Sequence, residues 1–395
     1  MPLPFDPPVR ASRFGFHACL CLLLAAPQFH LLGAAEPGGR GTPLPEINAG
    51  ARLVLTENWA SGVINQNTWY APRNQWGTGN HGVTRDNVRI ERDQVAGREQ
   101  FVLVCQANGD RYEGPVAGVD GQKTRVGGVL ISKDFFASGR FEVVMKFGHR
   151  EPSPGGPADS LRPKGMVPAL WTYAYRFVTV PKERADEFVP GVPLYNPHLK
   201  VYGRGANEYW SELDFPELGK GGVFDRGLYN AFVQNRADTQ TFDLGQVADG
   251  DYHIFTTDWR TKLVPIKNIK DSQVVVAEGF WWIRDKAVPF AEYLGNPLKR
   301  LGKDRYAVYA GDRADHWIDG RKVGENARFV PAMAAQLTMG VWLPGWAGPA
   351  DWATATASFA SIKVWQYDDP GDVRTILTGS LQDQFDASGR AIAKP

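Results

Sequence analysis

Short apolar runs separated by glycine, proline and other turn residues recur along the chain from residue 51 onward. Runs such as Phe101–Cys105, Phe141–Phe147 and Val274–Ala277 are typical of short β-strands. No stretch shows sustained helical periodicity, in which apolar residues recur three and four positions apart. We therefore expect one all-β domain over residues 51–369, built as a sandwich or a barrel.

Three carboxylates lie close together in the stretch Trp210–Leu218. Successive side chains of a strand point to opposite faces, so Glu212 and Asp214 are expected to share one face. Strict alternation would put Glu217 on the opposite, apolar face. One extra residue, a β-bulge, would return it to the acidic face. Pro216 favours a bulge at this point, because proline has no N–H to donate to the ladder.

The bulge would give two of these carboxylates a spacing suited to chemistry. The Cα atoms of Glu212 and Glu217 would lie about four strand steps apart, roughly 13 Å. Side chains leaning toward each other would then bring the carboxyl groups within roughly 5–6 Å, about the separation that retaining glycosidases use. A solvated acidic edge strand fits the same spacing, so the spacing alone leaves both interpretations open.

The acidic stretch resembles a known family signature. Residues 212–217, Glu-Leu-Asp-Phe-Pro-Glu, match the Glu-x-Asp-x-x-Glu pattern of glycoside hydrolase family 16, the laminarinase, lichenase and agarase group. This resemblance, which spans residues 51–368, implies a concanavalin A-like jelly-roll sandwich of two curved antiparallel sheets with a cleft on the concave face. Other segments resemble strands of that family in the same order: Gly128–Lys133, Gly139–Val143, Gly165–Trp171, Tyr252–Trp259, Trp317–Gly320, Met339–Trp342 and Ser361–Trp365.

The resemblance also implies catalytic roles. Glu212 would be the nucleophile and Glu217 the general acid/base. Asp214 would hold a hydrogen bond to Glu212 or share a proton with it. The implied activity is that of a retaining, endo-acting glycosidase that passes through a covalent glycosyl-enzyme at Glu212.

Four further residues are expected to bind substrate. Trp210 and Trp171 would stack on sugar rings, although a rim position for Trp210 and core packing for Trp171 fit the sequence as well. His253 would reach the cleft beside Glu217, or else be structural. Gln234 ends the strand after the acidic stretch, where many members of the family carry histidine, so it would help to choose the substrate.

The substrate stays open at this stage. We expect a β-1,3 or mixed-linkage β-glucan first, and a galactan such as agar, carrageenan or porphyran second. A sulfated galactan would need cationic side chains in the cleft, for which Arg162, Lys164 and Arg204 are the candidates, although solvated surface charge explains them as well. Pro216 stands where the family commonly has an apolar residue such as methionine. A transglycosylase that uses the same covalent intermediate, or a non-catalytic, lectin-like sugar-binding jelly roll, would also be compatible with this sequence.

Composition and the termini limit the partners and the location. The net charge of +1 gives no basic surplus to neutralise phosphates, which argues against nucleic acid as a partner. Residues 1–35 resemble a secretory signal peptide with a small-residue cleavage site, which predicts a secreted or periplasmic protein without a membrane anchor after cleavage; an uncleaved anchor is the competing interpretation. We expect a linker over residues 36–50 and a tail over residues 370–395.

The chain is expected to need no organic cofactor and to act as a monomer. After signal cleavage Cys105 would be its one cysteine, which excludes an internal disulfide and a cysteine metal site. The resemblance allows a structural calcium ion, for which no ligand cluster stands out. Three stretches, residues 149–164, 180–207 and 261–315, look like long loops that would wall the cleft. The third contains Trp281 and Trp282, which would stack on sugars or form the core of an insertion.

Overall fold

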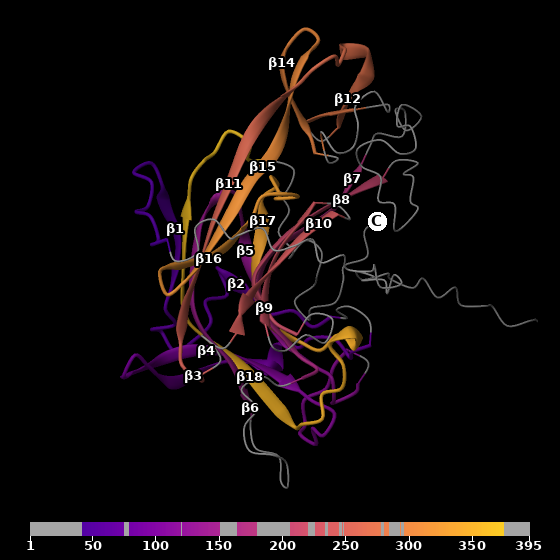
Figure 1. Ribbon diagram of the computed structural model, residues 1–395. Coiled ribbons are helices and arrows are strands. Elements are labelled where there is room, and N and C mark those ends of the chain that lie inside the picture. The colour runs from indigo at the N-terminus through magenta and orange to yellow at the C-terminus, as the bar shows by residue number, and fades with distance from the viewer. Residues whose placement is uncertain are drawn as a thin grey trace, which may run out of the picture.

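The protein is an all-β jelly-roll sandwich of two antiparallel sheets, which confirms the expected fold class (Figure 1). The computed structural model describes residues 42–74, 79–119, 121–150, 164–179, 206–219, 226–233, 236–244, 247, 249–277, 280–283, 293 and 296–374. Within these ranges no helix is long and apolar enough to cross a membrane. The predicted signal peptide lies outside the described residues, as do most of the first two predicted loops.

The larger sheet has eleven strands. In spatial order they are β12 (Val274–Ala277), β13 (Phe280–Ile283), β14 (Leu298–Gly302), β15 (Arg305–Ile318), β11 (His253–Ile266), β6 (Gly139–Arg150), β18 (Thr354–Gln366), β4 (Arg98–Asn108) and β3 (Val88–Val95), with β1 (Arg52–Glu57) beside β18 and β16 (Arg321–Asn326) beside β15.

The smaller sheet has seven strands. In spatial order they are β10 (Arg236–Asp243), β9 (Arg226–Val233), β8 (Ala206–Glu217), β7 (Val167–Thr179), β17 (Ala335–Trp342), β5 (Gly128–Phe136) and β2 (Trp69–Tyr70). Three 3₁₀ turns lie among the described loops: η1 (Arg85–Asn87), η5 (Asp271–Gln273) and η6 (Gly345–Ala347).

The core lies between the two sheets and follows from the alternation of apolar side chains along the strands. Leu213 and Phe215 of β8 are both buried in it. The ring of Phe215 lies 5.7 Å from that of Phe255 on β11, so the two sheets meet at this point through edge-to-face aromatic contacts. The opposite face of the seven-stranded sheet, which we call the outer face, receives the alternate residues of the same strands.

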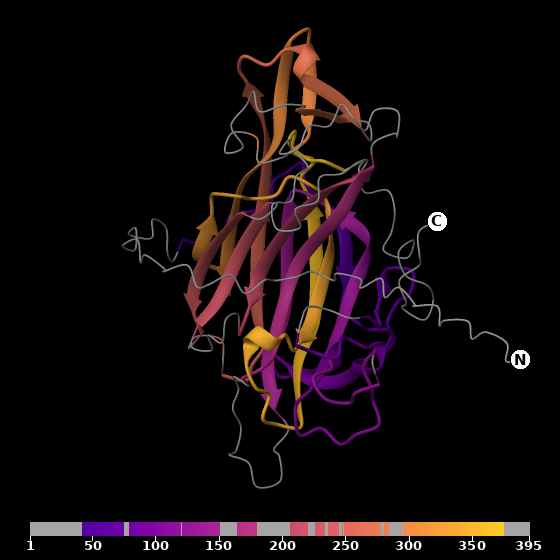
Figure 2. The ribbon, with the colours of Figure 1, turned by 90° about the vertical axis from the view of Figure 1, so that its right-hand side faces the viewer.

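The stretch 261–315, expected as a long loop, is mostly β-strand, so that expectation was wrong. β11 and β15 pair with each other from Phe255↔Ile318 as far as Ile266↔Tyr306, and β12, β13 and β14 extend the same sheet beyond them. In Figures 1 and 2 these strands project from one end of the sandwich. The projection has its own apolar cluster, formed by Ile269, Val274, Ile283, Tyr293, Leu298, Tyr306 and Val308.

The tryptophan pair of this projection is structural. Trp282 is fully buried and packs with Ala174 of β7 and with Met333, which attaches the projection to the body of the sandwich. Trp281 points to the opposite face of its strand, where its ring meets Tyr306 edge-to-face at 5.8 Å and the guanidinium of Arg300 covers it at 5.1 Å. Of the two interpretations, the core of an insertion therefore describes this pair.

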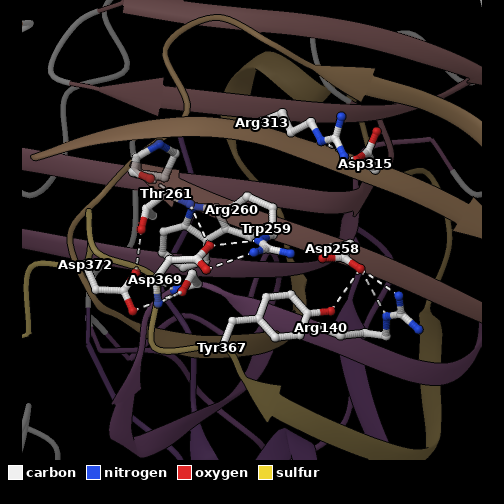
Figure 3. Close-up of polar contacts among 12 residues, drawn as sticks. Arg140, Asp258, Trp259, Arg260, Thr261, Arg313, Asp315, Tyr367, Asp369 and Asp372 are labelled. Carbon is white, nitrogen blue, oxygen red and sulfur yellow. Dashed lines mark hydrogen bonds and ion pairs between the residues drawn. The ribbon is translucent and has the colours of Figure 1, made fainter. Parts of the chain in front are cut away.

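Hydrogen bonds hold the C-terminal segment against β11 (Figure 3). The carboxylate of Asp369 accepts hydrogen bonds from Arg260 at 2.8 and 2.9 Å and from the backbone N–H of Thr261 at 3.1 Å. Asp372 accepts from the hydroxyl of Thr261 at 2.7 Å. Val373 is fully buried. The first residues of the predicted tail are thus part of the packed body.

We expect Asp369→Ala to weaken this attachment of the C-terminal segment to β11. Removing the carboxylate leaves the part-buried guanidinium of Arg260 and the N–H of Thr261 without their acceptor, at a cost of about 1–3 kcal/mol in the free energy of unfolding. Urea denaturation measures the change. Asp312→Ala is the matched control, because its ion pair with Lys262 is half-exposed and of small energetic value. An equal effect of both substitutions would contradict the prediction.

Candidate active site

The predicted bulge lies in β8 and changes the face on which its last glutamate points. Asp214 pairs with Trp171 on β7, and Glu217 pairs with Ala169, so three steps on β8 face two steps on β7. The same shift occurs against β9, where Asp214 and Glu217 pair with Asn230 and Leu228. β8 therefore contains one extra residue between the two carboxylates, as predicted, and the cis peptide bond Phe215–Pro216 lies inside this bulge.

The bulge brings Asp214 and Glu217 to one side chain. The amide nitrogen Nδ2 of Asn230 donates to Oδ2 of Asp214 at 3.1 Å and to Oε2 of Glu217 at 2.5 Å. All three side chains are almost fully buried. Because a single nitrogen reaches both carboxyl groups, Glu217 lies on the outer face with Asp214 and not in the core.

Glu212 shares this face. It pairs with Tyr173 on β7 and Phe232 on β9, and directly paired residues of antiparallel strands place their side chains on the same face. Counted along β7, which has no bulge here, Glu212 and Glu217 are separated by the four steps between Tyr173 and Ala169, roughly 13 Å between Cα atoms. Glu212 is half-buried, more open than its two acidic neighbours.

A row of paired residues crosses the whole seven-stranded sheet through Asp214. Residues aligned in this way lie side by side on one face, perpendicular to the strands. Asp214 is thus flanked by Trp171 on one side and by Asn230 on the other. From edge to edge the row reads Tyr70, Ile131, Thr338, Trp171, Asp214, Asn230 and Thr239.

Aromatic side chains gather on the outer face next to the carboxylates. Trp171 lies beside Asp214 and is buried within this cluster, which is the packed position given as the alternative to a sugar-stacking role. Tyr173, Trp342 and Trp346 pack against the same cluster but stay partly exposed. The rings of Trp342 and Trp346 meet edge-to-face at 5.4 Å. These three rings therefore leave apolar surface open on the outer face beside the carboxylates.

The structure does not bring His253 to this group. It begins β11 of the other sheet, where its ring is held between Asp319 at 2.7 Å and Asp249 at 3.0 Å. Trp210 lies on β8 opposite Tyr175, and its side chain is outside the described part. Gln234 also lies outside the described residues.

The sequence did not predict a role for Asn230 or Tyr173 in this group. It also gave no role to the tryptophans Trp342 and Trp346. The strand containing Asn230 was recognised, but its partner residue on β8 depends on the bulge and on strand register, which a single sequence does not fix. Trp342 lies in a segment that carried the family resemblance, and counting two positions at a time from Thr338 would have put it on the face of Trp171.

The described residues offer no group of three or more histidine, cysteine, aspartate or glutamate side chains arranged to hold a metal ion. Cys105 is buried in the core, and burial raises the pKa of its thiol far above the usual range, so it has no place in the chemistry of the outer face.

We expect Asn230→Ala to lower kcat by about 10- to 100-fold, because the two carboxyl groups lose the donor that positions them. Initial rates with a polysaccharide substrate and thermal unfolding are measured together. Thr239→Ala is the matched control, since Thr239 is the exposed neighbour of Asn230 in the same row. Wild-type kcat in Asn230→Ala would show that this amide has no positioning role.

No family model matches the sequence, and no curated protein matches it. Among solved structures, the catalytic domain of an endo-1,3-β-glucanase (laminarinase) from Thermotoga petrophila RKU-1 is similar with 16% identity and a TM-score of 0.46, over 81% of this chain and 99% of that one. A β-1,3-1,4-glucanase (lichenase) derived from a mouse hindgut metagenome is similar with 14% identity and a TM-score of 0.43, over 78% and 97%. SCLam, a non-specific endo-β-1,3(4)-glucanase from family GH16, has 14% identity and a TM-score of 0.45, over 84% and 97%.

Proposed function

We propose that this protein is an exported retaining endo-β-glycosidase of the family 16 type, acting on β-1,3 or mixed-linkage β-glucan. The observation that carries the proposal is the bulge in β8. It turns Glu217 onto the outer face, where it shares the amide of Asn230 with Asp214 and stands with Glu212 beside partly exposed aromatic rings.

The arrangement supports a two-step reaction. In the first step a carboxylate oxygen of Glu212 attacks the anomeric carbon, while Glu217 gives its proton to the departing glycosidic oxygen. In the second step Glu217 takes a proton from a water molecule, and the resulting hydroxide displaces Glu212 from the anomeric carbon. Two inversions restore the original anomeric configuration.

Asp214 and Asn230 would organise this pair. Asn230 donates to both carboxyl groups on its side, so it fixes Asp214 and Glu217 relative to each other. Asp214 stands between the two glutamates on the same face, so the donor that it shares with Glu217 lies on the side of the nucleophile's strand.

The aromatic cluster favours an uncharged substrate. Tyr173, Trp342 and Trp346 present neutral rings, whose faces suit the C–H surfaces of a glucan. Of the cationic residues considered for a sulfated galactan, Arg162 and Arg204 lie outside the described residues, and Lys164 is exposed at the start of the segment leading into β7. A neutral β-glucan is therefore preferred over the sulfated galactans carrageenan and porphyran.

Product analysis on a substrate panel tests the proposal. The mature protein is incubated with laminarin, lichenan, agarose, carrageenan, porphyran and xyloglucan, and the products are separated by size and followed by NMR at the anomeric carbon. We expect short oligosaccharides from laminarin or lichenan that first appear in the β configuration. Binding to a glucan without any cleavage would support a lectin-like protein instead, and cleavage of only a galactan would reassign the substrate.

A further inference from the structure

The turn that carries Trp346 is fastened by a single arginine, Arg125. Nη2 of its guanidinium donates to the carbonyl oxygens of Leu343 at 3.4 Å, Pro344 at 3.3 Å and Gly348 at 3.3 Å. These carbonyls lie on both sides of η6, the 3₁₀ turn that contains Trp346. One guanidinium edge thus holds both ends of the turn.

The same guanidinium ties this turn to two other loops. Nε of Arg125 donates to the carbonyl of Gly79 at 2.8 Å, and Nη1 reaches Oδ1 of Asp110 at 3.3 Å. The other carboxylate oxygen of Asp110 accepts from the N–H of Ala350 at 2.8 Å, just beyond the turn. Arg125 is therefore the common point of three loops that meet at one end of the outer face.

Two features suggest that this contact is specific to arginine. The side chain is only 17% exposed, and its planar fork satisfies five oxygen atoms in different directions, which the compact ammonium group of lysine cannot do. Arg125 also holds a backbone φ of +54°, a region that disfavours residues with a Cβ atom. The strained backbone conformation therefore occurs at the same residue that supplies the guanidinium.

The loops also meet closely in space. A Cβ atom added to Gly79 would lie 2.6 Å from Cα of Gly345, so Gly79 permits the contact between its loop and the turn. Gly345 directly precedes Trp346, whose ring meets Trp342 edge-to-face on the outer face. The loop that Arg125 binds at Gly79 therefore contacts the residue next to the ring.

We propose that Arg125 is a positioning residue for substrate binding. It fixes the turn that contains Trp346, so that the rings of Trp346 and Trp342 form a rigid aromatic wall, meaning one rigid contact surface, at one end of the outer face. Trp342 pairs with Val167, one row beyond Pro168 and two beyond the row of Ala169, Gly340 and Glu217. The wall therefore lies past Glu217 and would contact a sugar unit next to the reacting one. This inference rests on the proposed glycosidase function.

A double-mutant cycle between Arg125 and Trp346 tests the proposal. Steady-state kinetics on the polysaccharide cleaved by the wild type are compared for Arg125→Gln, Trp346→Ala and the double variant. We expect each single substitution to raise KM about tenfold with kcat changed less than about twofold, and the double variant to resemble Trp346→Ala alone. Additive losses would show that Arg125 does not act through Trp346, and a fall confined to kcat would also overturn the proposal.

Three controls distinguish the loss of the Arg125 guanidinium from other effects of a substitution in this region. Arg111→Gln removes an arginine of the same loop region whose ion pair with Asp351 is exposed, and it should leave KM unchanged. Arg125→Gly removes the side chain and also relieves the backbone at φ +54°, so a KM equal to that of Arg125→Gln identifies the guanidinium as the cause. A wild-type KM in Arg125→Gly would overturn the proposal.

Hydrogen exchange of the intact protein, the third control, gives a readout that does not need activity. Amides of residues 343–350 should exchange at least about tenfold faster in Arg125→Gln than in Arg111→Gln, because a loosened turn opens more often. Equal exchange in the two variants would refute the fastening role even if the enzyme is active. Faster exchange in a protein that cleaves none of the glucans would instead refute the proposed function and the substrate-binding role, and leave only the fastening.

Discussion

Glu212→Gln should reduce the release of reducing sugar by at least about 10³-fold while the melting temperature stays within a few degrees of the wild type. The amide is nearly the same size as the carboxylate, but its oxygen cannot form the glycosyl-enzyme. Glu212 is half-buried on the outer face, so the substitution leaves the core between the sheets intact. Activity and thermal unfolding are measured on the same preparation.

The substrate's leaving group distinguishes the two glutamates. In an aryl glycoside with an acidic phenol, the leaving group departs as the phenolate and needs no proton from a general acid. Glu217→Gln should therefore still release the phenol in a first burst. Glu212→Gln should release none, because no covalent intermediate forms. The control is Glu142→Gln on β6 of the larger sheet, whose carboxylate pairs with Lys363 away from the acidic face. If Glu217→Gln behaves like Glu212→Gln with this substrate, the assignment of the acid is wrong.

The bulge that underlies these roles could be predicted because its cause is local. Pro216 cannot donate to the ladder, and the acidic and apolar side chains around it fit one face each only if a residue is added. The fold class could be predicted for the same reason, since short alternating runs bounded by turns are also local signals.

The partners of the carboxylates could not be predicted, because they depend on register between strands far apart in the sequence. Asn230 meets Asp214 only because β9 pairs with β8 from Ser211↔Val233 to Glu217↔Leu228. His253, by contrast, lies on the other sheet, although its segment resembles a strand of the family. Neither relation is visible in the residues themselves.

The projection could not be predicted from the family resemblance, because the segments that resemble the family lie on either side of it. The stretch Val274–Ala277 was recognised as an apolar run of the strand type, yet the whole region was expected to be a loop. β15 runs unbroken from Arg305 to Ile318, so one long strand belongs both to the projection and to the sandwich. Resemblance indicates which segments are shared, and it says little about the structure of what lies between them.

A buried histidine, His316, makes the stability of the fold sensitive to acid pH. His316 lies in the core directly beneath the bulge, with its ring 4.5 Å from that of Phe215 and 4.6 Å from that of Tyr229. Oδ1 of Asn326 accepts from Nε2 at 2.9 Å, since the amide nitrogen of Asn326 already donates to a carbonyl. Burial favours the neutral ring, in which Nδ1 accepts from the hydroxyl of Thr257 at 3.0 Å.

This neutral state makes stability depend on pH. Burial lowers the pKa of His316 from 6.5 to about 3. Between these values the unfolded chain takes up a proton at this position and the folded protein does not, so stability is full above pH 6.5 and falls as the pH drops toward 3. The difference between the two pKa values corresponds to about 4–5 kcal/mol over this range. His253 has the opposite sign: burial lowers its pKa, but Asp319 and Asp249 raise it by more, so its contribution is present below pH 6.5 and is lost as the pH rises.

His316→Gln should therefore give a flatter pH profile than the wild type. The amide can keep one hydrogen bond but has no proton to gain, so the variant is less stable at pH 7 and loses less on going to pH 4. Free energies of unfolding by urea at each pH, for the wild type, His316→Gln and His253→Gln, measure the difference. Because the ring of His316 supports Phe215 inside the bulge, activity of the wild type should fall together with its stability at acid pH. Parallel stability profiles for the wild type and His316→Gln would mean that this histidine is not the group that takes up the proton on unfolding.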